Sequence, residues 1–322
     1  MKTSTSRVVR PIVAIAMGAA LGSLTILLPA FRTAPTPAPV IAFVPRTSGT
    51  NFTEDMHHGA EAAAKSAGYQ IYWNAPTRGD DVDRQIAIAE RAVNKGAKAL
   101  VLGPTNPWGV TTMLNEFESR KVPVVVVQTE LPMPTGPYLT SVAPDQVQFG
   151  RIAASRIVQI TGGAGEVAIV GLDRGTPETL VRAKSFIEAM KAYPGIEVVA
   201  QAPGSVQTLE AEQSAREVIG EFPLLKAVFA VSANATEGVM VAIENMNPKP
   251  LILLVGCDRD LFLVDGVLQG RIDSLVTADP YETGYEAVHA ALVGAGGHLL
   301  PPPLHMKAEL LTRQNYAQIE NH

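Results

Sequence analysis

The chain has 322 residues, of which 47% are hydrophobic and 18% charged, and its formal net charge is −5. This acidic balance argues against a nucleic-acid-binding protein, because such proteins are usually basic. The single cysteine, Cys257, excludes an internal disulfide and a zinc site built from several cysteines, and the length allows two domains with a sizeable core.

The N-terminus predicts export from the cytoplasm. Lys2, Arg7 and Arg10 precede a long uncharged apolar stretch, and a linker rich in proline, threonine and alanine follows at 32–39. Positive residues before an apolar segment are typical of a secretory signal. The stretch is long for a cleaved signal and just long enough to span a bilayer. Residues 1–31 are therefore predicted to be either a signal peptide or a membrane anchor, with the following domain outside the inner membrane.

From residue 40 on, short apolar runs alternate with segments of helical periodicity. The predicted strands are 40–44, 69–73, 98–102, 123–127, 166–170, 196–200, 227–231, 251–255 and 273–277. Most of these runs are continuously apolar, which is typical of strands buried on both faces of a parallel sheet. The alternation of strands and helices predicts an α/β fold with parallel sheets.

An internal repeat indicates two similar halves. Residues 85–106 align without a gap with 213–234, and the strand at 40–44 is similar to the one at 166–170. Identity is low, so a chance match is the alternative. The matching order of strand and helix favours two similar α/β lobes.

Four stretches resemble the periplasmic sugar-binding proteins of the ribose-binding type, which are substrate receptors of ABC importers. They are "IAFVPRTSGTNFTEDMHHGAEAAAKSAGYQI", "GAKALVLGPTN" with the later "KVPVVVVQT", "VRAKSFIEAM", and "VGCDRDLFLVDGVLQGRIDSLVTADPYETGYEAV". The last stretch is the most specific, because it combines Gly-Cys-Asp, Gln-Gly and Asp-Pro-Tyr at characteristic spacings. The resemblance covers the chain from about Val40 to Asn321.

The resemblance implies the type I periplasmic binding protein fold, in which two Rossmann-like lobes are joined by three chain crossings and close on a ligand. Lactose-repressor-type regulators share this fold. The implied boundaries are 40–143 plus 279–302 for the N-terminal lobe and 144–278 plus 303–322 for the C-terminal lobe. In open parallel sheets ligands bind beyond the carboxyl ends of the strands, which agrees with a cleft between the lobes.

Asp258 is the leading candidate for ligand contact, because it directly follows an apolar strand. The resemblance implies that its carboxylate accepts hydrogen bonds from sugar hydroxyls, for which a charged acceptor is well suited. The alternative is that Asp258 caps the helix that starts near Asp260. The neighbouring Cys257 is interpreted as a buried small hydrophobe rather than a nucleophile.

The other candidates lie on predicted loops at strand ends or on a helix. The ligand-binding residues implied by the resemblance are Thr50, Asn51, Phe52, Gln128, Arg182, Ser232, Asn234 and Asp258. Four of the polar candidates have a structural alternative: a helix cap for Thr50, Asn51 and Asn234, and a surface ion pair with Glu178 for Arg182. Phe52 either stacks on a sugar face or packs at the start of its helix.

Three positions depart from the ribose pattern. Ribose-type proteins have an Asp-Arg pair where this chain has Gln128 and Thr129, and often a glutamine where it has Ala278. The cleft has therefore lost charge and an amide, and unpaired buried polar groups cost about 1–3 kcal/mol each. The ligand is left open among another monosaccharide, a polyol, a deoxy sugar and an autoinducer-like furanose.

The expected function is an extracytoplasmic receptor that delivers a monosaccharide or sugar-like ligand to an ABC permease, as a monomer and without binding nucleic acid. The alternatives are a membrane-anchored sensor and a sugar-responsive regulator of the same fold. A regulator would carry an N-terminal helix-turn-helix, where this chain has an export segment. We expect no catalytic residue, no cofactor and no metal, because adjacent His57 and His58 point apart on a helix and cannot chelate one ion together.

Overall fold

The structure is a computed structural model that describes residues 37–319. The predicted signal peptide or anchor at 1–31 lies outside the described residues. The chain from Ala38 onward forms one compact unit. Among the described helices, none has the length and apolar character needed to cross a bilayer.

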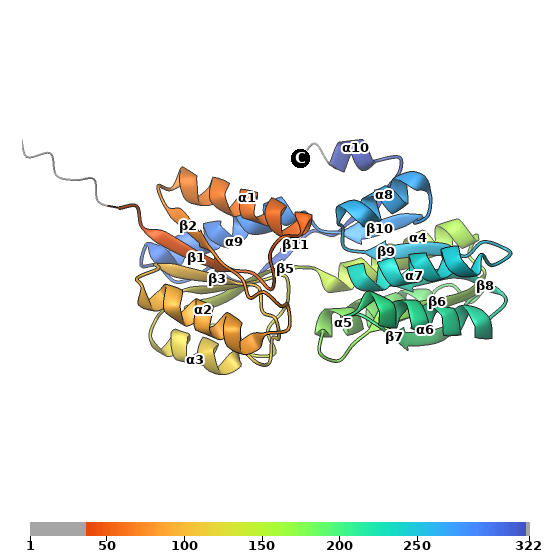
Figure 1. Cartoon of the computed structure of the whole chain (residues 1–322), viewed down its shortest axis with the longest axis horizontal. Coiled ribbons are helices and arrows are strands. Elements are labelled where there is room, and N and C mark those ends of the chain that lie inside the picture. Colours follow the sequence, from red (N-terminus) through yellow and green to blue (C-terminus); the bar gives the residue numbers. More distant parts are fainter. Residues whose placement is uncertain (1–36, 320–322) are drawn as a thin grey trace, which may run out of the picture. The chain divides into compact units, whose positions relative to one another are not determined.

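The first sheet has six strands in the order β11-β5-β4-β3-β1-β2, and its paired neighbours all run parallel. The strands are β1 (Val40–Val44), β2 (Gln70–Trp73), β3 (Ala99–Leu102), β4 (Val124–Val127), β5 (Leu139–Pro144) and β11 (Leu304–Met306). Its helices are α1 (Asn51–Ser66), α2 (Val82–Asn94), α3 (Thr111–Ser119) and α9 (Pro280–Ala295). These elements are called the first lobe (Figure 1).

Alternate residues of β1 show how the sheet is covered on both faces. Ile41 and Phe43 pack in the core formed with α1 and α9, whereas Ala42 and Val44 pack in the core formed with α2 and α3. Successive side chains of a strand point to opposite faces, so a continuously apolar strand fills two cores.

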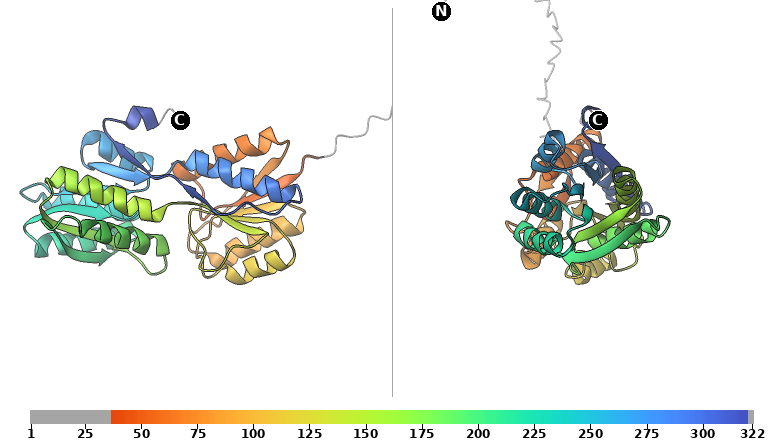
Figure 2. Two further views of the ribbon diagram at one scale, coloured as in Figure 1. Left: turned by 180° about the vertical axis from the view of Figure 1, so that it is seen from behind. Right: turned by 90° about the vertical axis from the view of Figure 1, so that its right-hand side faces the viewer.

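The second sheet has the order β12-β10-β9-β8-β6-β7, with only β12 antiparallel to its neighbour. Its strands are β6 (Gly165–Leu172), β7 (Ile196–Pro203), β8 (Leu225–Ala230), β9 (Leu253–Cys257), β10 (Ser274–Thr277) and β12 (Glu309–Thr312). Its helices are α4 (Gln146–Thr161), α5 (Pro177–Met190), α6 (Thr208–Glu221), α7 (Ala233–Met246), α8 (Leu261–Gln269) and α10 (Tyr316–Ile319). In this second lobe α4 and α5 cover one face of the sheet, and α6, α7 and α8 cover the other (Figures 1 and 2).

The predicted two-lobed α/β fold is confirmed, and the strands paired by the repeat occupy equivalent places. β1 and β6 are fifth in their sheets, and β3 and β8 are fourth. The chain passes between the sheets after β5, after β10 and between β11 and β12.

The structure differs from the predicted boundaries at the last of these crossings. β11 pairs with β5, so Leu304–Met306 lies in the first lobe, although residues 303–322 were assigned to the C-terminal lobe. The sequence prediction also missed β5, β11 and β12. β5 contains Thr140 and Ser141, β11 has three residues with His305 at its centre, and β12 has two leucines between Glu309 and Thr312, so none forms a continuous apolar run.

Two close helix contacts help to position the site. α1 and α9 meet where Gly59 faces the carbonyl of Tyr281, and α4 meets α5 where Gly150 faces the carbonyl of Arg182. A side chain at either glycine would collide with backbone. Gly150 thus lets α4 lie directly against the turn of α5 that carries Arg182.

Candidate functional site

The centre of the site is an ion pair between Arg182 and Asp258, which lie 76 residues apart in sequence. Arg182 Nη1 and Nη2 donate to the two carboxylate oxygens of Asp258 at 3.0 and 2.9 Å. Asp258 directly follows β9 and has a φ of 64°, the left-handed region that few non-glycine residues adopt. Its N–H donates to Val276 O at 2.8 Å, which ties this turn to β10.

Arg182 is held on every side by the second lobe. Its Nε donates to Gln146 Oε1 at 2.7 Å, and Nη1 also donates to Val231 O at 2.9 Å. The guanidinium lies 4.2 Å from the ring centre of Phe149, a cation–π contact. Burial alone lowers the pKa of Arg182, but the charge and hydrogen bonds of Asp258, together with the neighbouring Cys257 and Glu178, outweigh burial and raise the pKa above its usual value. The arginine is therefore charged, rigid and buried.

Asp258 keeps part of its hydrogen-bonding capacity for another molecule. Its side chain is 32% exposed, whereas that of Arg182 is 5% exposed. An ionised carboxylate offers about four acceptor positions, and Arg182 occupies two of them. The alternative role as a helix cap belongs to Asp260, whose Oδ1 accepts from Leu263 N at 2.9 Å at the start of α8.

Cys257 is fully buried beneath this pair. Its backbone N–H donates to Thr236 Oγ1 at 3.1 Å. Burial raises the pKa of the Cys257 thiol to about 12, although the charge of Arg182 opposes the rise. A thiol that stays protonated at neutral pH is a poor nucleophile, so Cys257 has a structural role.

In the loop between β1 and α1, Thr50 caps the helix α1, which is the structural alternative given for this residue. Thr50 Oγ1 accepts from Thr53 N at 3.2 Å, and Thr53 Oγ1 accepts from Thr50 N at 3.1 Å. Asn51 is exposed as the first residue of α1, and Phe52 is partly buried against the core beside this helix. These contacts fix the loop and leave Asn51 accessible.

Two further candidates follow β8 and are occupied in fixing loops. Ser232 caps α7 by accepting from Ala235 N at 3.2 Å. The side-chain amide of Asn234 donates to Ser205 O at 3.2 Å and Val206 O at 2.9 Å. Asn234 thereby ties the loop after β7 to the start of α7. It does not cap this helix, as the structural alternative for Asn234 had supposed.

Gln128 and Thr129 lie at the carboxyl end of β4. Gln128 has a φ of 71°, another left-handed position, and its N–H donates to Val142 O at 3.2 Å. Thr129 is buried, and its hydroxyl lies within hydrogen-bond distance of two acceptors, Glu130 O at 3.3 Å and Glu178 Oε2 of α5 at 3.4 Å. Ala278, the third departure from the ribose pattern, is buried after β10.

The sequence prediction missed several residues that build the site. Gln146 and Phe149 on α4 support Arg182, and Glu178 on α5 contacts Thr129 and Arg46 rather than forming an ion pair with Arg182. Gln146 and Phe149 follow the strand that the prediction missed. The available signal was the aspartate-capped start of α4 at residue 145.

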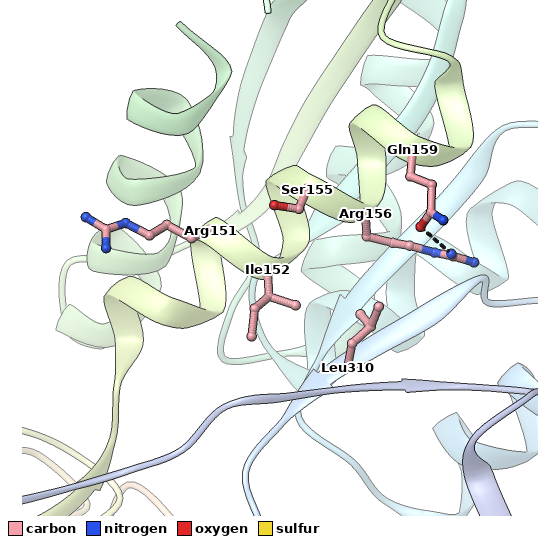
Figure 3. A pocket seen from close by; sticks show the side chains of 6 residues that line it. All are labelled: Arg151, Ile152, Ser155, Arg156, Gln159 and Leu310. Carbon is pink, nitrogen blue, oxygen red and sulfur yellow. Dashed lines mark hydrogen bonds between the residues drawn. The ribbon is translucent and has the colours of Figure 1, made fainter. Parts of the chain in front are cut away.

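Two surface hollows lie outside the set of predicted ligand-binding side chains, and one of them is lined by Arg259, the neighbour of Asp258, and by Thr277 and Asp279 on either side of Ala278. One is lined along α4 by Arg151, Ile152, Ser155, Arg156 and Gln159, with Leu310 of β12 opposite (Figure 3). The other lies beside the crossings, between α9, β11 and β12. None of the predicted ligand-binding residues lines either hollow. Among residues 37–319, no cluster of His, Cys, Asp and Glu is arranged to hold a metal ion.

The two α/β lobes have mostly parallel sheets, and a fixed ion pair lies at the carboxyl end of one strand. These features define a two-lobed ligand-binding protein. Residues 41–297 match the family described as the periplasmic binding protein domain, and the chain belongs to this family.

Known relatives extend the comparison. The chain is 26% identical over 250 residues to a D-allose-binding periplasmic protein of Escherichia coli, covering 76% of this chain and 80% of that one. An Agrobacterium vitis ABC transporter solute-binding protein bound with alpha-D-tagatopyranose superposes with a TM-score of 0.80 at 23% identity, covering 88% and 98% of the two chains. A solute-binding protein of Agrobacterium radiobacter in complex with D-arabinose superposes with a TM-score of 0.78 at 25% identity, covering 88% and 98%.

Proposed function

We propose that this protein is an extracytoplasmic receptor that binds a monosaccharide or sugar-like ligand and delivers it to an ABC permease. The observation that carries this proposal is the buried, rigid Arg182 that holds a partly exposed Asp258 at the carboxyl end of β9. The family and the sugars bound by structurally similar proteins support it.

The Arg182–Asp258 pair suits a neutral polyhydroxylated ligand. A carboxylate accepts short, strong hydrogen bonds from hydroxyl groups. Because Arg182 already balances the charge of Asp258, the ligand need not bring a positive charge of its own. Thr50, Asn51, Phe52, Gln128, Ser232 and Asn234 are proposed as further ligand contacts, either directly or through the loops that they hold.

A thermal-shift screen tests the proposal. The panel contains D-allose, D-ribose, D-apiose, D-tagatose, D-arabinose and myo-inositol. A sugar present at 100 times its dissociation constant adds about 2.7 kcal/mol of stability to the folded state. We expect at least one sugar to raise the melting temperature and to bind in calorimetry. A flat response to the whole panel would contradict a receptor for the kinds of sugar that its relatives are named for or contain.

The location, partner and oligomeric state need separate measurements. We propose that the full chain reaches the periplasm or the outer face of the inner membrane, that it works with a membrane permease, and that it is a monomer. Cell fractionation with the native N-terminus tests the location, and light scattering of the purified domain tests the oligomeric state. Recovery of the native chain from the cytoplasm would contradict the proposed location.

A further inference from the structure

The hollow beside the crossings is lined by both lobes. It has a volume of about 1300 Å³ and lies between α9 and β11 of the first lobe and β12 of the second. Residues of two crossings also line it, Thr277 and Asp279 after β10 and Lys307 and Ala308 between β11 and β12. A rotation of one lobe against the other turns on these segments, so it must change the width of this hollow.

Most of the charged side chains around this hollow have a partner. The paired side chains are Lys307 and Glu309 at 3.4 Å, Glu286 and His289 at 3.7 Å, and His305 and Glu130 at 3.8 Å. Asp279 caps α9, because its Oδ1 accepts from Glu282 N at 3.2 Å. The two charged side chains that remain are Arg259 and Glu282. Within residues 37–319, neither of these side chains forms an ion pair or a hydrogen bond.

The two unpaired charges have opposite signs and belong to opposite lobes. Arg259 lies in the second lobe, where it follows Asp258 in the turn between β9 and α8. Glu282 lies in the first turn of α9, just after the chain has crossed into the first lobe. The hollow therefore separates a free guanidinium on one lobe from a free carboxylate on the other.

The backbone that carries each charge is fixed within its own lobe. Asp258 N–H donates to β10 at 2.8 Å, and Asp260 caps α8 at 2.9 Å, so Arg259 extends from a fixed turn. The first turn of α9 is capped by Asp279 and packs closely against Gly59 of α1. A movement of the lobes therefore carries each charge along with its lobe.

Glu282 has a negative environment that a cation would relieve. Burial raises the pKa of Glu282, and so do the charges of three neighbouring carboxylates, whereas Lys307 lowers it. A guanidinium that approaches this carboxylate offsets the repulsion and can donate two parallel hydrogen bonds to it. Arg259 is the cation lining the hollow that has no other partner within the described part of the chain.

We propose that Arg259 and Glu282 form an ion pair between the lobes when the protein closes on its ligand, and that this pair stabilises the closed state. This inference rests on the proposed function, in which the lobes close on a sugar. The pair acts on the equilibrium between open and closed protein and does not touch the ligand. It therefore changes the affinity for every bound sugar by the same factor.

The test compares Arg259→Gln, Glu282→Gln and the double variant with the parent protein in calorimetry. The ligands are the two panel sugars that bind the parent most tightly. A partly exposed ion pair corresponds to a loss of about two- to fivefold in affinity. We expect this loss in each single variant and for both sugars. The double variant should lose no more than a single variant, because either change already breaks the pair.

Salt and charge exchange give two further readouts. Raising the salt concentration to about 1 M should weaken sugar binding to the parent but not to the double variant, because salt screens the ion pair and the sugar is uncharged. Arg259→Glu should weaken binding more than Arg259→Gln, since it places two carboxylates opposite each other. Adding Glu282→Arg to Arg259→Glu should recover part of this loss.

Matched controls remove charges that already have a partner. Glu286→Gln lies on the same helix and lines the same hollow, where its partner is His289. Arg216→Gln lies in the second lobe, where its partner is Glu212. We expect both controls to bind sugar like the parent, and melting curves verify that every variant is folded.

The outcomes separate this inference from the receptor function. If the parent binds sugar and the Arg259 and Glu282 variants bind equally well or more tightly, the pair is overturned and the receptor function stands. Losses that multiply in the double variant, or a loss confined to one sugar, would also overturn the pair. A parent that binds none of the panel would overturn the receptor function, and this inference with it.

Discussion

Opposite charges are paired in two different ways, once within the second lobe and once between the two lobes. In the second lobe, Arg182 and Asp258 form a two-bond pair supported by Gln146, Val231 and Phe149. Arg46, in the loop after β1 of the first lobe, makes one hydrogen bond within the described part of the chain, and its Nη2 lies 3.7 Å from Oε1 of Glu178 in the second lobe.

This difference indicates that the two charge pairs have different roles in ligand binding. The second lobe carries a group whose orientation is fixed before any ligand binds, which lowers the cost of ordering side chains on binding. Arg46 in the first lobe keeps guanidinium N–H groups that a ligand can bind. A buried ion pair is by itself weak evidence for stability, because desolvation offsets the attraction. Removing one partner is costly, however, and this makes the comparison testable.

The largest effect is expected from Arg182→Met. This change leaves Asp258 without its counter-charge and leaves the carbonyl of Val231 and the amide oxygen of Gln146 without a donor. Breaking a buried pair costs about 3–5 kcal/mol, and the partial exposure of Asp258 favours the lower end. Urea unfolding should show the loss, whereas Arg46→Gln should lose less than about 1 kcal/mol. Equal losses in the two variants would remove the proposed difference between the lobes.

Asp258→Asn should weaken binding and also lower stability, because it leaves the buried Arg182 without its counter-charge. Asparagine keeps one acceptor oxygen for Arg182 but loses the charge, so bonds to the ligand weaken. Each hydrogen bond to a charged group contributes about 1.5–3 kcal/mol, so we expect at least a tenfold loss of sugar affinity in calorimetry. Cys257→Ser is the neighbouring control and should keep the parent's affinity. Loss of binding in the serine variant alone would mean that the roles of the two neighbours are reversed.

The Cys257 thiol should resist a thiol reagent in the folded protein. Its folded-state pKa of about 12 lies above the ordinary value because of burial, so the reactive thiolate is scarce at pH 8. Rapid labelling is expected only after unfolding in urea. The unfolded thiol ionises at lower pH than the folded one, so its contribution to stability falls as the pH rises above about 8.5. Fast labelling of the native protein would show that the second lobe is less rigid than the structure indicates.

The smallest effect is expected from Glu282→Gln on α9, beside the crossings. Burial, followed by the charges of Asp279, Glu286 and Glu309, raises the pKa of Glu282. Its ionised form is therefore unfavourable in the folded state, and stability is lost as the pH rises through the folded-state pKa. The variant should gain less than about 0.5 kcal/mol at pH 7, because solvent screens this exposed side chain. Melting curves should converge below about pH 4; a difference that persists there would rule out this electrostatic cause.

The sequence by itself determined the two-lobed α/β fold and the position of Asp258. Continuously apolar runs identify buried parallel strands, and Asp258 directly follows one of them, so its place at a strand end is a local property. The weak repeat was sufficient to match β3 with β8 because both runs fill equivalent central places in a sheet.

Only the tertiary structure decided which side chains contact one another in the site. Arg182 contacts Asp258, which is 76 residues away in the sequence, and Gln146, which is 36 residues away. Thr129 and Glu178 are separated by 49 residues. Periodicity and spacing in the sequence carry no information about contacts at such separations. The repeat even misleads at one position. Gln85 is buried and holds three backbone groups, whereas Gln213, its counterpart in the repeat, is exposed and contacts Glu217. A side chain's role depends on which loops surround it, and only the packed fold brings those loops together.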